Sequence, residues 1–247
     1  MYSDSLYTGM AGLQATTAQM QAVASNLANA QTPGYEAVQA VTDAQLYQGT
    51  NAPAGADAAV ETLGPDLKPG PLKETDDPLN VGVGGDAWMQ VQTANGTALT
   101  RNGALSISST GILTDSAGDP ILNSSGTPIS LPSLSKLQIG SDGTVSGVLA
   151  SDTSGKSQSF GQISLVSTPP GTLSSLGGSL YQAPSGTAFA PATDGSLHQG
   201  YLNDSNVDPT TAMMEMINSS RSYQLQTDLM KSQSGASQDL NNLLAQG

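Results

Sequence analysis

The 247-residue chain has no cysteine, one histidine and one tryptophan, and only 4% of its residues are aromatic. The absence of cysteine excludes disulfide bonds and thiolate metal sites, and it suits an oxidising compartment. A Ser-His-Asp triad would depend on His198, which lies between turn residues in GSLHQGYL, and the chain has no G-x-S-x-G motif. We therefore predict no catalytic residue and no metal site, and we expect that the protein is not an enzyme.

Basic residues are also scarce, because 7 Lys and Arg stand against 20 Asp and Glu, a formal net charge of −13. Nucleic-acid backbones and acidic membrane surfaces both attract basic faces, so neither is an expected partner. No run of 18 apolar residues is present to span a bilayer. Residues 1–30 lack the basic and apolar regions of a cleaved secretory signal peptide, so we expect no such signal and no membrane span.

Motifs that bind cofactors are missing as well. The chain has neither GxxxxGK[ST] nor a GxGxxG between a strand and a helix, which predicts no cofactor and no small-molecule substrate. Acid clusters at Glu74/Asp76/Asp77 and at Asp115/Asp119 leave one enzymatic alternative, a glycoside hydrolase with paired carboxylates. The low aromatic content argues against it, since sugar subsites usually stack on aromatic rings.

The N-terminal zone carries a repeat of apolar residues that alternates spacings of four and three. Residues 3–29 contain no proline, and Ala and Gln fill most positions outside the repeat. The pattern predicts a helix of roughly 40 Å that packs either on its own domain or in a coiled-coil seam. The repeat consists of Leu6, Met10, Leu13, Thr17, Met20, Ala24 and Leu27.

The C-terminal zone predicts a second long helix. Asp208 is a good N-cap, Pro209 suits the first helical position, and no proline follows. Two stripes on one helix indicate two neighbours rather than one. The first stripe consists of Met216, Ser220, Tyr223, Thr227, Met230, Ser234, Ser237, Asn241 and Leu244, and the second of Leu225, Leu229, Ala236, Leu240 and Leu243.

Between these zones the amino-acid composition changes twice. Residues 48–74 are rich in Gly, Ala, Pro and acid, which predicts an extended arm over 48–78. Short apolar pairs broken by single glycines and by predicted hairpin turns at Asn95-Gly96, Asn102-Gly103 and Asp142-Gly143 predict an all-β domain over 79–202, an irregular barrel or a sandwich. The expected fold is therefore mainly β, with a helical stem formed by residues 1–47 and 203–247.

The stretch SNLANAQTPGYE marks where the first helix ends. Asn29 can cap the helix, Pro33 blocks its continuation and Gly34 accepts a positive φ, so Thr32 to Tyr35 form a predicted stop and turn. Asn26 and Asn29 are a poor choice for a purely apolar core. We predict that their amides fix the register of helix packing, as polar residues do in coiled-coil seams.

Three segments together resemble the bacterial flagellar rod and hook family. They are ASNLANAQTPGYEA after the first helix, PLNVGVGGDAWMQVQTANGTALTRNGALSISSTGILT in the middle, and GYLNDSNVDPTTAMMEMINSSRSYQLQTDLM near the end. The short chain, the brief segment after the first helix and the run Asp86-Ala87-Trp88-Met89 favour the proximal-rod branch of this family over its distal-rod branch. Outside the family, an extracellular β-domain binding module or adhesin is the remaining alternative.

The resemblance implies a structural subunit of the flagellar basal body, located in the rod within the periplasmic space. It implies export through the flagellar type III apparatus and assembly with proximal and distal rod proteins, with the terminal helices as the assembly interface. The expected interface residues are Leu6, Met10, Leu13, Met20, Asn26, Leu27, Asn29, Met213, Met216, Ile217, Arg221, Tyr223, Leu225, Leu229, Met230, Leu240, Leu243 and Leu244.

Overall fold

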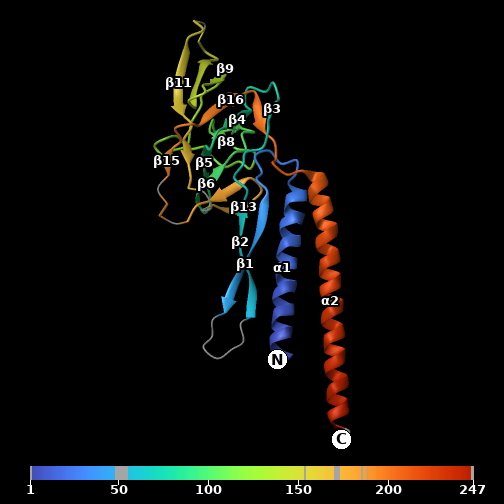
Figure 1. The fold of residues 1–247 in the computed structure, drawn as a ribbon. Helices are drawn as coiled ribbons and strands as arrows, with labels where there is room; N and C mark the ends of the chain where they lie inside the picture. The colour runs from blue at the N-terminus through green and yellow to red at the C-terminus, as the bar shows by residue number, and fades with distance from the viewer. Residues whose placement is uncertain are drawn as a thin grey trace. The chain divides into compact units, whose positions relative to one another are not determined.

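The computed structural model describes residues 2–47, 55–152, 154–169, 173–184, 186–187 and 189–245, with the side chains of 1–8, 40–63 and 237–247 not described. The chain divides into two compact units (Figure 1). The helical unit comprises Met1–Ala28, Val38–Gly64 and Asp208–Gly247. The β unit comprises Asn29–Ala37 and Pro65–Val207.

Two long helices dominate the helical unit, as the sequence predicts. Helix α1 spans Tyr2–Ala28 and helix α2 spans Pro209–Ala245, and the two lie side by side with both chain ends at the same end of the pair, so they are antiparallel (Figure 1). Asp208 caps α2 as expected: its Oδ1 accepts from the Thr210 N–H at 3.0 Å and its Oδ2 from the Thr211 hydroxyl at 2.7 Å. With 37 residues, α2 is about 55 Å long.

Small residues let the two helices approach. A Cβ atom on Gly9 of α1 would overlap the Sδ atom of Met230 on α2. Further along the pair, the Thr16 hydroxyl lies 3.0 Å from the side-chain oxygen of Gln226, and Thr16 is buried. The contact between α1 and α2 is therefore partly polar, which agrees with the many Ser, Thr and Gln residues in both helices.

A two-stranded sheet completes the helical unit. Strand β1 (Val38–Tyr47) pairs with β2 (Gly55–Pro65), and residues 48–54 between them lie outside the described part of the chain. The predicted arm over 48–78 thus includes β2 and β3. Its Gly, Ala and Pro content concealed these strands, because neither shows the alternation of large apolar and polar residues by which a strand is recognised.

The β unit is built from several small sheets, and the strands described in it do not close a barrel. The largest sheet has six strands in the order β13-β14-β6-β5-β12-β15, and a three-stranded sheet has the order β11-β10-β9. Three two-stranded sheets pair β16 with β4, β17 with β3 and β7 with β8. The strands are β3 (Leu72–Glu74), β4 (Val81–Gly84), β5 (Trp88–Thr93), β6 (Gly96–Thr100), β7 (Ser106–Ile107), β8 (Leu113–Thr114), β9 (Leu134–Ile139), β10 (Thr144–Leu149), β11 (Ser157–Gln162), β12 (Leu165–Ser167), β13 (Ser174–Gly177), β14 (Leu180–Gln182), β15 (Ala190–Pro191), β16 (Ser196–Gln199) and β17 (Tyr201–Asn203).

Two of the three predicted hairpin turns are present. Asn95-Gly96 joins β5 to β6, and Asp142-Gly143 joins β9 to β10. Asn102-Gly103 does not form a hairpin. The Asn102 side chain accepts from the Ala104 N–H instead, and Gly103 is needed because a Cβ atom there would overlap the carbonyl oxygen of Val81.

Between β7 and β9 a large buried residue recurs every eight positions, and turns separate successive copies. Leu113, Ile121 and Ile129 are buried, and their backbones form a closed ring in which each N–H donates to the carbonyl of another member at 2.9–3.1 Å. Gly118 and Gly126, each with a positive φ, close the tips of two of the turns. The ring explains how short apolar pairs separated by polar turns build a core without long strands.

The six-stranded sheet buries side chains on both faces. Met89, Val91 and Ala98 belong to one apolar cluster, while Trp88 and Leu99 belong to another. Because successive side chains of a strand point to opposite faces, β5 and β6 each contribute to both clusters. The second cluster surrounds Trp88, the only tryptophan of the chain.

Candidate functional site

Helix α2 exposes an apolar stripe along one side. Leu225 and Leu229 are 71% and 69% exposed, and Met214 and Ile217 are more than half exposed. With about 3.6 residues per turn, these four positions fall on the side of α2 opposite the one formed by Ala212, Met216, Ser219, Gln226 and Met230, which are the less exposed positions facing α1. One side of α2 thus serves the intramolecular contact, and the other is open.

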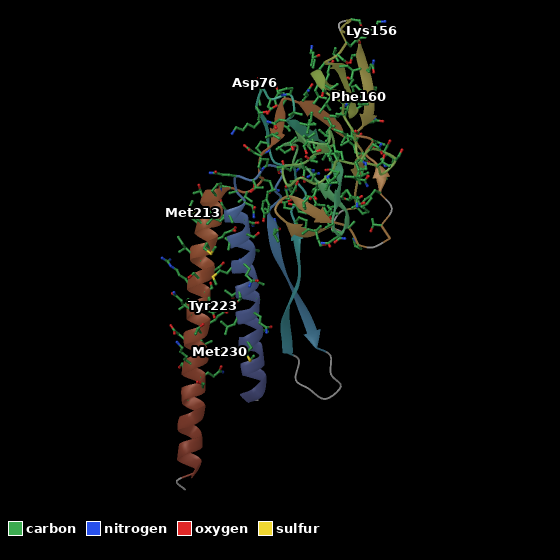
Figure 2. All side chains as sticks on the ribbon, turned by 180° about the vertical axis from the view of Figure 1, so that it is seen from behind. Asp76, Lys156, Phe160, Met213, Tyr223 and Met230 are labelled. Carbon is green, nitrogen blue, oxygen red and sulfur yellow. The ribbon has the colours of Figure 1, made fainter. Side chains whose placement is uncertain are left out.

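The expected interface residues separate into three groups. Exposed ones are Met10, Met213, Ile217, Arg221, Tyr223, Leu225 and Leu229, of which Met213 and Tyr223 are labelled with Met230 in Figure 2. Buried or half-buried ones are Leu13, Met20, Asn26, Leu27, Asn29, Met216 and Met230. The side chains of Leu6, Leu240, Leu243 and Leu244 lie outside the described ones.

Asn26 has a clear structural partner in its own chain. Its Nδ2 donates to the carbonyl of Val38 at 2.9 Å, and its Oδ1 accepts from the Val38 N–H at 2.8 Å, with both residues buried. The amide therefore takes the place of a neighbouring strand for the first residue of β1. Asn29 lies just after α1, where its Oδ1 accepts from the Thr32 hydroxyl at 3.1 Å.

The residues between α1 and β1 form a tightly held segment of the β unit, which we call the strap (Asn29–Ala37). Gly34 has a φ of +67°, and a Cβ atom there would overlap the backbone of Asn102, so only glycine fits. The Gly34 N–H donates to the carbonyl of Asn203 at 2.8 Å, and Tyr35 is 2% exposed. Thr32 to Tyr35 form a turn, but one that is buried against the β unit.

A buried ion pair fastens the strap. Nη1 of Arg101 lies 2.5 Å from Oε1 of Glu36 and donates to the carbonyl of Leu67 at 2.7 Å, while its Nε donates to the carbonyl of Ala87 at 3.0 Å. Arg101 and Glu36 are each 1% exposed. One guanidinium therefore joins three segments that are far apart in the sequence.

Two aromatic rings enclose this ion pair. The Arg101 guanidinium lies 4.1 Å from the centre of the Trp88 ring, an arrangement that favours a cation over the ring face. Tyr181 meets Trp88 edge to face at 5.1 Å, and its hydroxyl accepts from the Glu36 N–H at 2.7 Å. The strap, β5 and β14 are thus held together at one point.

Burial controls the protonation of these groups. It raises the pKa of Glu36 to about 7, against the opposing pull of Arg101, while Asp66 and Asp86 add to the rise. Burial also raises the pKa of Tyr181, whose hydroxyl is therefore neutral at physiological pH.

Two asparagines hold the remaining segments of this region. The amide of Asn203 accepts from the Val83 N–H at 2.6 Å and donates to its carbonyl at 2.9 Å. Asn206 accepts from the Ala37 N–H at 2.6 Å and donates to the carbonyls of Asp66 and Lys68. Sequence reasoning assigned no role to Arg101, Asn203 or Asn206 in packing; the signal available was that Arg101 is one of only two arginines in the chain.

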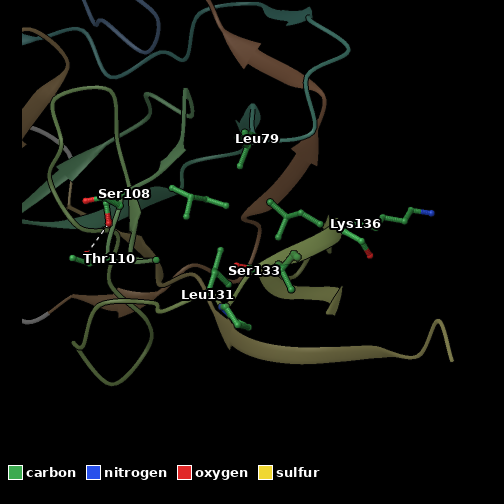
Figure 3. Close-up of a pocket in the computed structure, with 13 residues that line it drawn as sticks. Leu79, Ser108, Thr110, Leu131, Ser133 and Lys136 are labelled. Atoms are coloured by element: carbon green, nitrogen blue, oxygen red, sulfur yellow. Dashed lines mark hydrogen bonds between the residues drawn. The ribbon is translucent and has the colours of Figure 1, made fainter. Parts of the chain in front are cut away.

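The β unit also has a shallow groove of about 500 Å³ between the β7–β8 turn and β9 (Figure 3). Leu79, Ile107 and Leu131 supply its apolar walls, hydroxyl groups of Ser108 and others supply most of its polar atoms, and Lys136 is its charged member. This lining offers no pair of carboxylates for acid–base chemistry.

The acid clusters have structural roles where contacts are present. Oδ1 of Asp115 accepts from the N–H groups of Ala117 and Asp119, each at 2.9 Å, which closes a turn. Within the described part of the chain no three His, Asp or Glu side chains are grouped to hold a metal ion. No helix described here is apolar enough over its length to cross a membrane.

Three protein-family models match the chain. One described as "Flagella basal body rod protein" matches residues 6–35, and one described as "Flagellar hook protein FlgE/F/G D1 domain" matches residues 82–147. A third, "Flagellar basal body rod FlgEFG protein C-terminal", matches residues 198–243. The matches thus include α1 with most of the strap, the middle of the β unit and most of α2.

Curated relatives match over nearly the whole chain. The flagellar basal-body rod protein FlgF of Escherichia coli K12 is 32% identical, over 97% of this chain and 98% of its own length. FlgF of Salmonella typhimurium is 32% identical over 92% of each chain. The flagellar basal-body rod protein FlgG of Bacillus subtilis is 30% identical over 97% of this chain and 98% of its own length.

Proposed function

The chain belongs to the family of flagellar basal-body rod proteins and is a structural rod subunit similar to FlgF, and from this premise we propose that it joins the rod through its two terminal helices. The observation that carries the proposal is the exposed stripe of α2. Met214, Ile217, Leu225 and Leu229 present large apolar side chains to solvent along a helix that already uses its opposite side against α1.

An exposed stripe of this length is costly for an isolated subunit and useful in an assembly. Monomeric proteins rarely expose continuous apolar surface, and burying one leucine side chain contributes about 1.5–3 kcal/mol. Repeated contacts between non-equivalent surfaces build helical filaments when their rotation does not close a ring. The stripe of α2 would serve as one such surface, with helices of neighbouring rod subunits as its partners.

The methionines fit contacts with more than one kind of neighbour. Met10, Met213 and Met214 are each about half exposed, and the unbranched methionine side chain repacks easily against different surfaces. A subunit located between proximal and distal rod proteins would meet non-identical helices. We assign the chain to the proximal rod, with the distal rod as the alternative within the family.

The remaining parts of the proposal concern transport and location. The subunit would reach the rod through the flagellar type III export apparatus and function in the basal body within the periplasmic space. Charged residues make up only 11% of the chain and apolar stripes extend along both helices, so we expect the helical unit to gain much of its stability on assembly.

The test uses Leu225→Glu/Leu229→Glu in the chromosomal copy of the gene. We expect loss of swimming and of complete rods, because two carboxylates would have to be buried without partners. Gln224→Glu is the matched control for the added charge, since Gln224 is exposed but lies about 100° around α2 from Leu225, and this variant should swim normally. Normal rods in the double variant would refute the proposed role of the stripe.

Site-specific crosslinking distinguishes the two rod positions. A photoreactive residue at position 225 should crosslink to rod subunits, and identification of the products by mass spectrometry tells proximal from distal neighbours. Crosslinks exclusively to distal rod protein would contradict the proximal assignment while leaving the assembly surface intact.

A further inference from the structure

Arg101 is a cation paired with two carboxyl groups, and a third carboxyl acts on one of these. It bonds Glu36 directly, and its Nη2 lies 3.9 Å from Oδ1 of Asp86. Asp66, whose backbone N–H bonds the strap at the Ala37 carbonyl, acts electrostatically on the same Glu36 carboxyl. One positive charge does not balance three negative ones, so the region has excess negative charge whenever all three acids are ionised.

The position of Glu36 makes it the acid most affected by this excess. The Asp86 side chain is 95% exposed and water screens its charge, whereas the Glu36 side chain is 2% exposed. Oε2 of Glu36 has no hydrogen-bond partner among the described residues. A buried carboxylate oxygen without a partner opposes ionisation, because the charged form loses solvation that nothing replaces.

Protonation of Glu36 reduces the excess negative charge and removes the cost of ionising a carboxyl whose Oε2 atom has no partner. It does not break the contact with Arg101. Oε1 can still accept from Arg101, and the local charge falls by one. The Tyr181 hydroxyl also lies beside Glu36, and burial raises its pKa, so this group is neutral near pH 7. Glu36 is therefore the group through which a proton would reach this region.

We propose that Glu36 is a proton-linked latch: uptake of one proton tightens the attachment of the strap to the β unit, and its loss loosens that attachment. A change in the attachment of the strap would act on both neighbouring elements, because the strap is the covalent link between α1 and β1. The inference depends on contacts within the β unit, and it would hold whether or not the helices assemble as proposed.

The sign of the pH dependence follows from linkage. The pKa of Glu36 is about 7 in the folded protein against an ordinary value of 4.5, so between these values the folded chain holds a proton that the unfolded chain has released. The free energy of unfolding therefore decreases as pH rises through this window, and the contribution of Glu36 becomes constant above pH 7. Below pH 4.5 both states are protonated and the stabilisation is fully present.

Trp88 provides a built-in reporter for the test. It is the only tryptophan, and its ring lies directly under Arg101, so its fluorescence responds to the strap and to global unfolding. Urea unfolding of the full-length protein is followed at this signal from about pH 5 to about pH 8. We expect the urea midpoint to fall with rising pH in the wild type and to fall less in Glu36→Gln, which keeps the shape and one acceptor oxygen.

Two further variants make the result specific. His198→Gln removes the only histidine, a residue type that titrates in the same window, and should leave the pH dependence unchanged. Asp66→Asn removes the half-exposed acid that acts more strongly on Glu36 and should shift the fall of the urea midpoint to lower pH. The latch is refuted if Glu36→Gln keeps the wild-type pH dependence, if His198→Gln abolishes it, or if Asp66→Asn leaves the fall of the midpoint at the same pH.

Discussion

The guanidinium of Arg101 lies 4.1 Å from the centre of the Trp88 ring in the interior of the β unit, and the carboxylate of Glu36 bonds it in the same interior. The pair joins the strap to the six-stranded sheet. Arg101→Met keeps much of the side-chain length but removes the charge.

We expect Arg101→Met to lower the free energy of unfolding by about 3–5 kcal/mol at pH 8, because it leaves the Glu36 carboxylate buried without its partner. Urea denaturation followed by circular dichroism measures the change. Lys136→Met is the control, since it removes a positive charge from an exposed strand position and should change stability by about 0.5 kcal/mol or less. A loss below about 1 kcal/mol in Arg101→Met would show that the ion pair is dispensable.

A comparison of Gly34 and Gly118 separates the free-energy cost of backbone strain from the cost of close packing. Both have a positive φ, but a Cβ atom would overlap the Asn102 backbone at Gly34 and would meet nothing at Gly118. Gly118→Ala should cost about 1–2 kcal/mol from strain alone. Gly34→Ala should cost clearly more, because the strap must also move; equal losses in thermal or urea denaturation would contradict the close approach.

Thr16 and Thr17 form a matched pair on α1. Each hydroxyl bonds a carbonyl of its own helix four residues earlier, but only Thr16 also reaches Gln226 on α2. Thr16→Val should destabilise the helix pair by about 0.5–1.5 kcal/mol, and Thr17→Val should have little effect. Hydrogen exchange of α1 amides measures the difference, and equal exchange in the two variants would argue against the Thr16–Gln226 contact.

Asp115 and Asp142 should respond to neutralisation in opposite directions. Burial raises the pKa of Asp115, whereas hydrogen bonds from Thr144 lower the pKa of exposed Asp142. A raised pKa means that stability is lost as pH rises through it, so Asp115→Asn should gain stability over the wild type with increasing pH. A lowered pKa means the reverse, so Asp142→Asn should be the less stable variant at neutral pH and match the wild type in acid.

Asn123 supports this expectation for Asp115. It occupies the corresponding position in the next turn, where its Oδ1 accepts from the N–H groups of Ser125 and Thr127. An asparagine thus closes the same kind of turn without a charge. Denaturation midpoints of the wild type, Asp115→Asn and Asp142→Asn measured at several pH values test both expectations. Parallel pH curves for the two variants would disprove the opposite pKa shifts of Asp115 and Asp142.

Asn26 should matter more than Asn29. Asn26→Leu removes the partners of two buried backbone groups of Val38, which costs about 1–3 kcal/mol for each group left unsatisfied. Asn29→Leu affects a half-exposed side chain that contacts Thr32 and should cost less. Exchange rates of the β1 amides report the effect, and an unprotected Val38 amide in the wild type would refute the contact.

Features that depend on neighbours in the sequence were predictable. The start of α2 follows from Asp208-Pro209, which caps and initiates a helix whatever surrounds it, and the hairpin at Asn95-Gly96 follows from the turn chemistry. The end of α1 was equally accessible, because Pro33 and Gly34 interrupt a helix locally.

Features that depend on residues distant in the sequence were not predictable. Glu36 and Arg101 are 65 residues apart, and nothing in either local sequence shows that they meet. Asn102-Gly103 illustrates the same limit in reverse: its composition indicates a hairpin, but the close approach of Gly103 to Val81 determines its conformation. The α2 stripe lies between these cases, since helical periodicity predicts it and packing against α1 determines which side stays open.

The turn from Asn123 to Gly126 offers a position for an imaging label. Ser124 and Ser125 are exposed at the tip of a turn whose base is fixed by the backbone ring of Leu113, Ile121 and Ile129. A short epitope inserted between the two serines would extend from a rigid base and leave both helices untouched, since exposed polar tips tolerate insertions well. Labelled subunits made this way would let fluorescence microscopy count and time their arrival in single living cells.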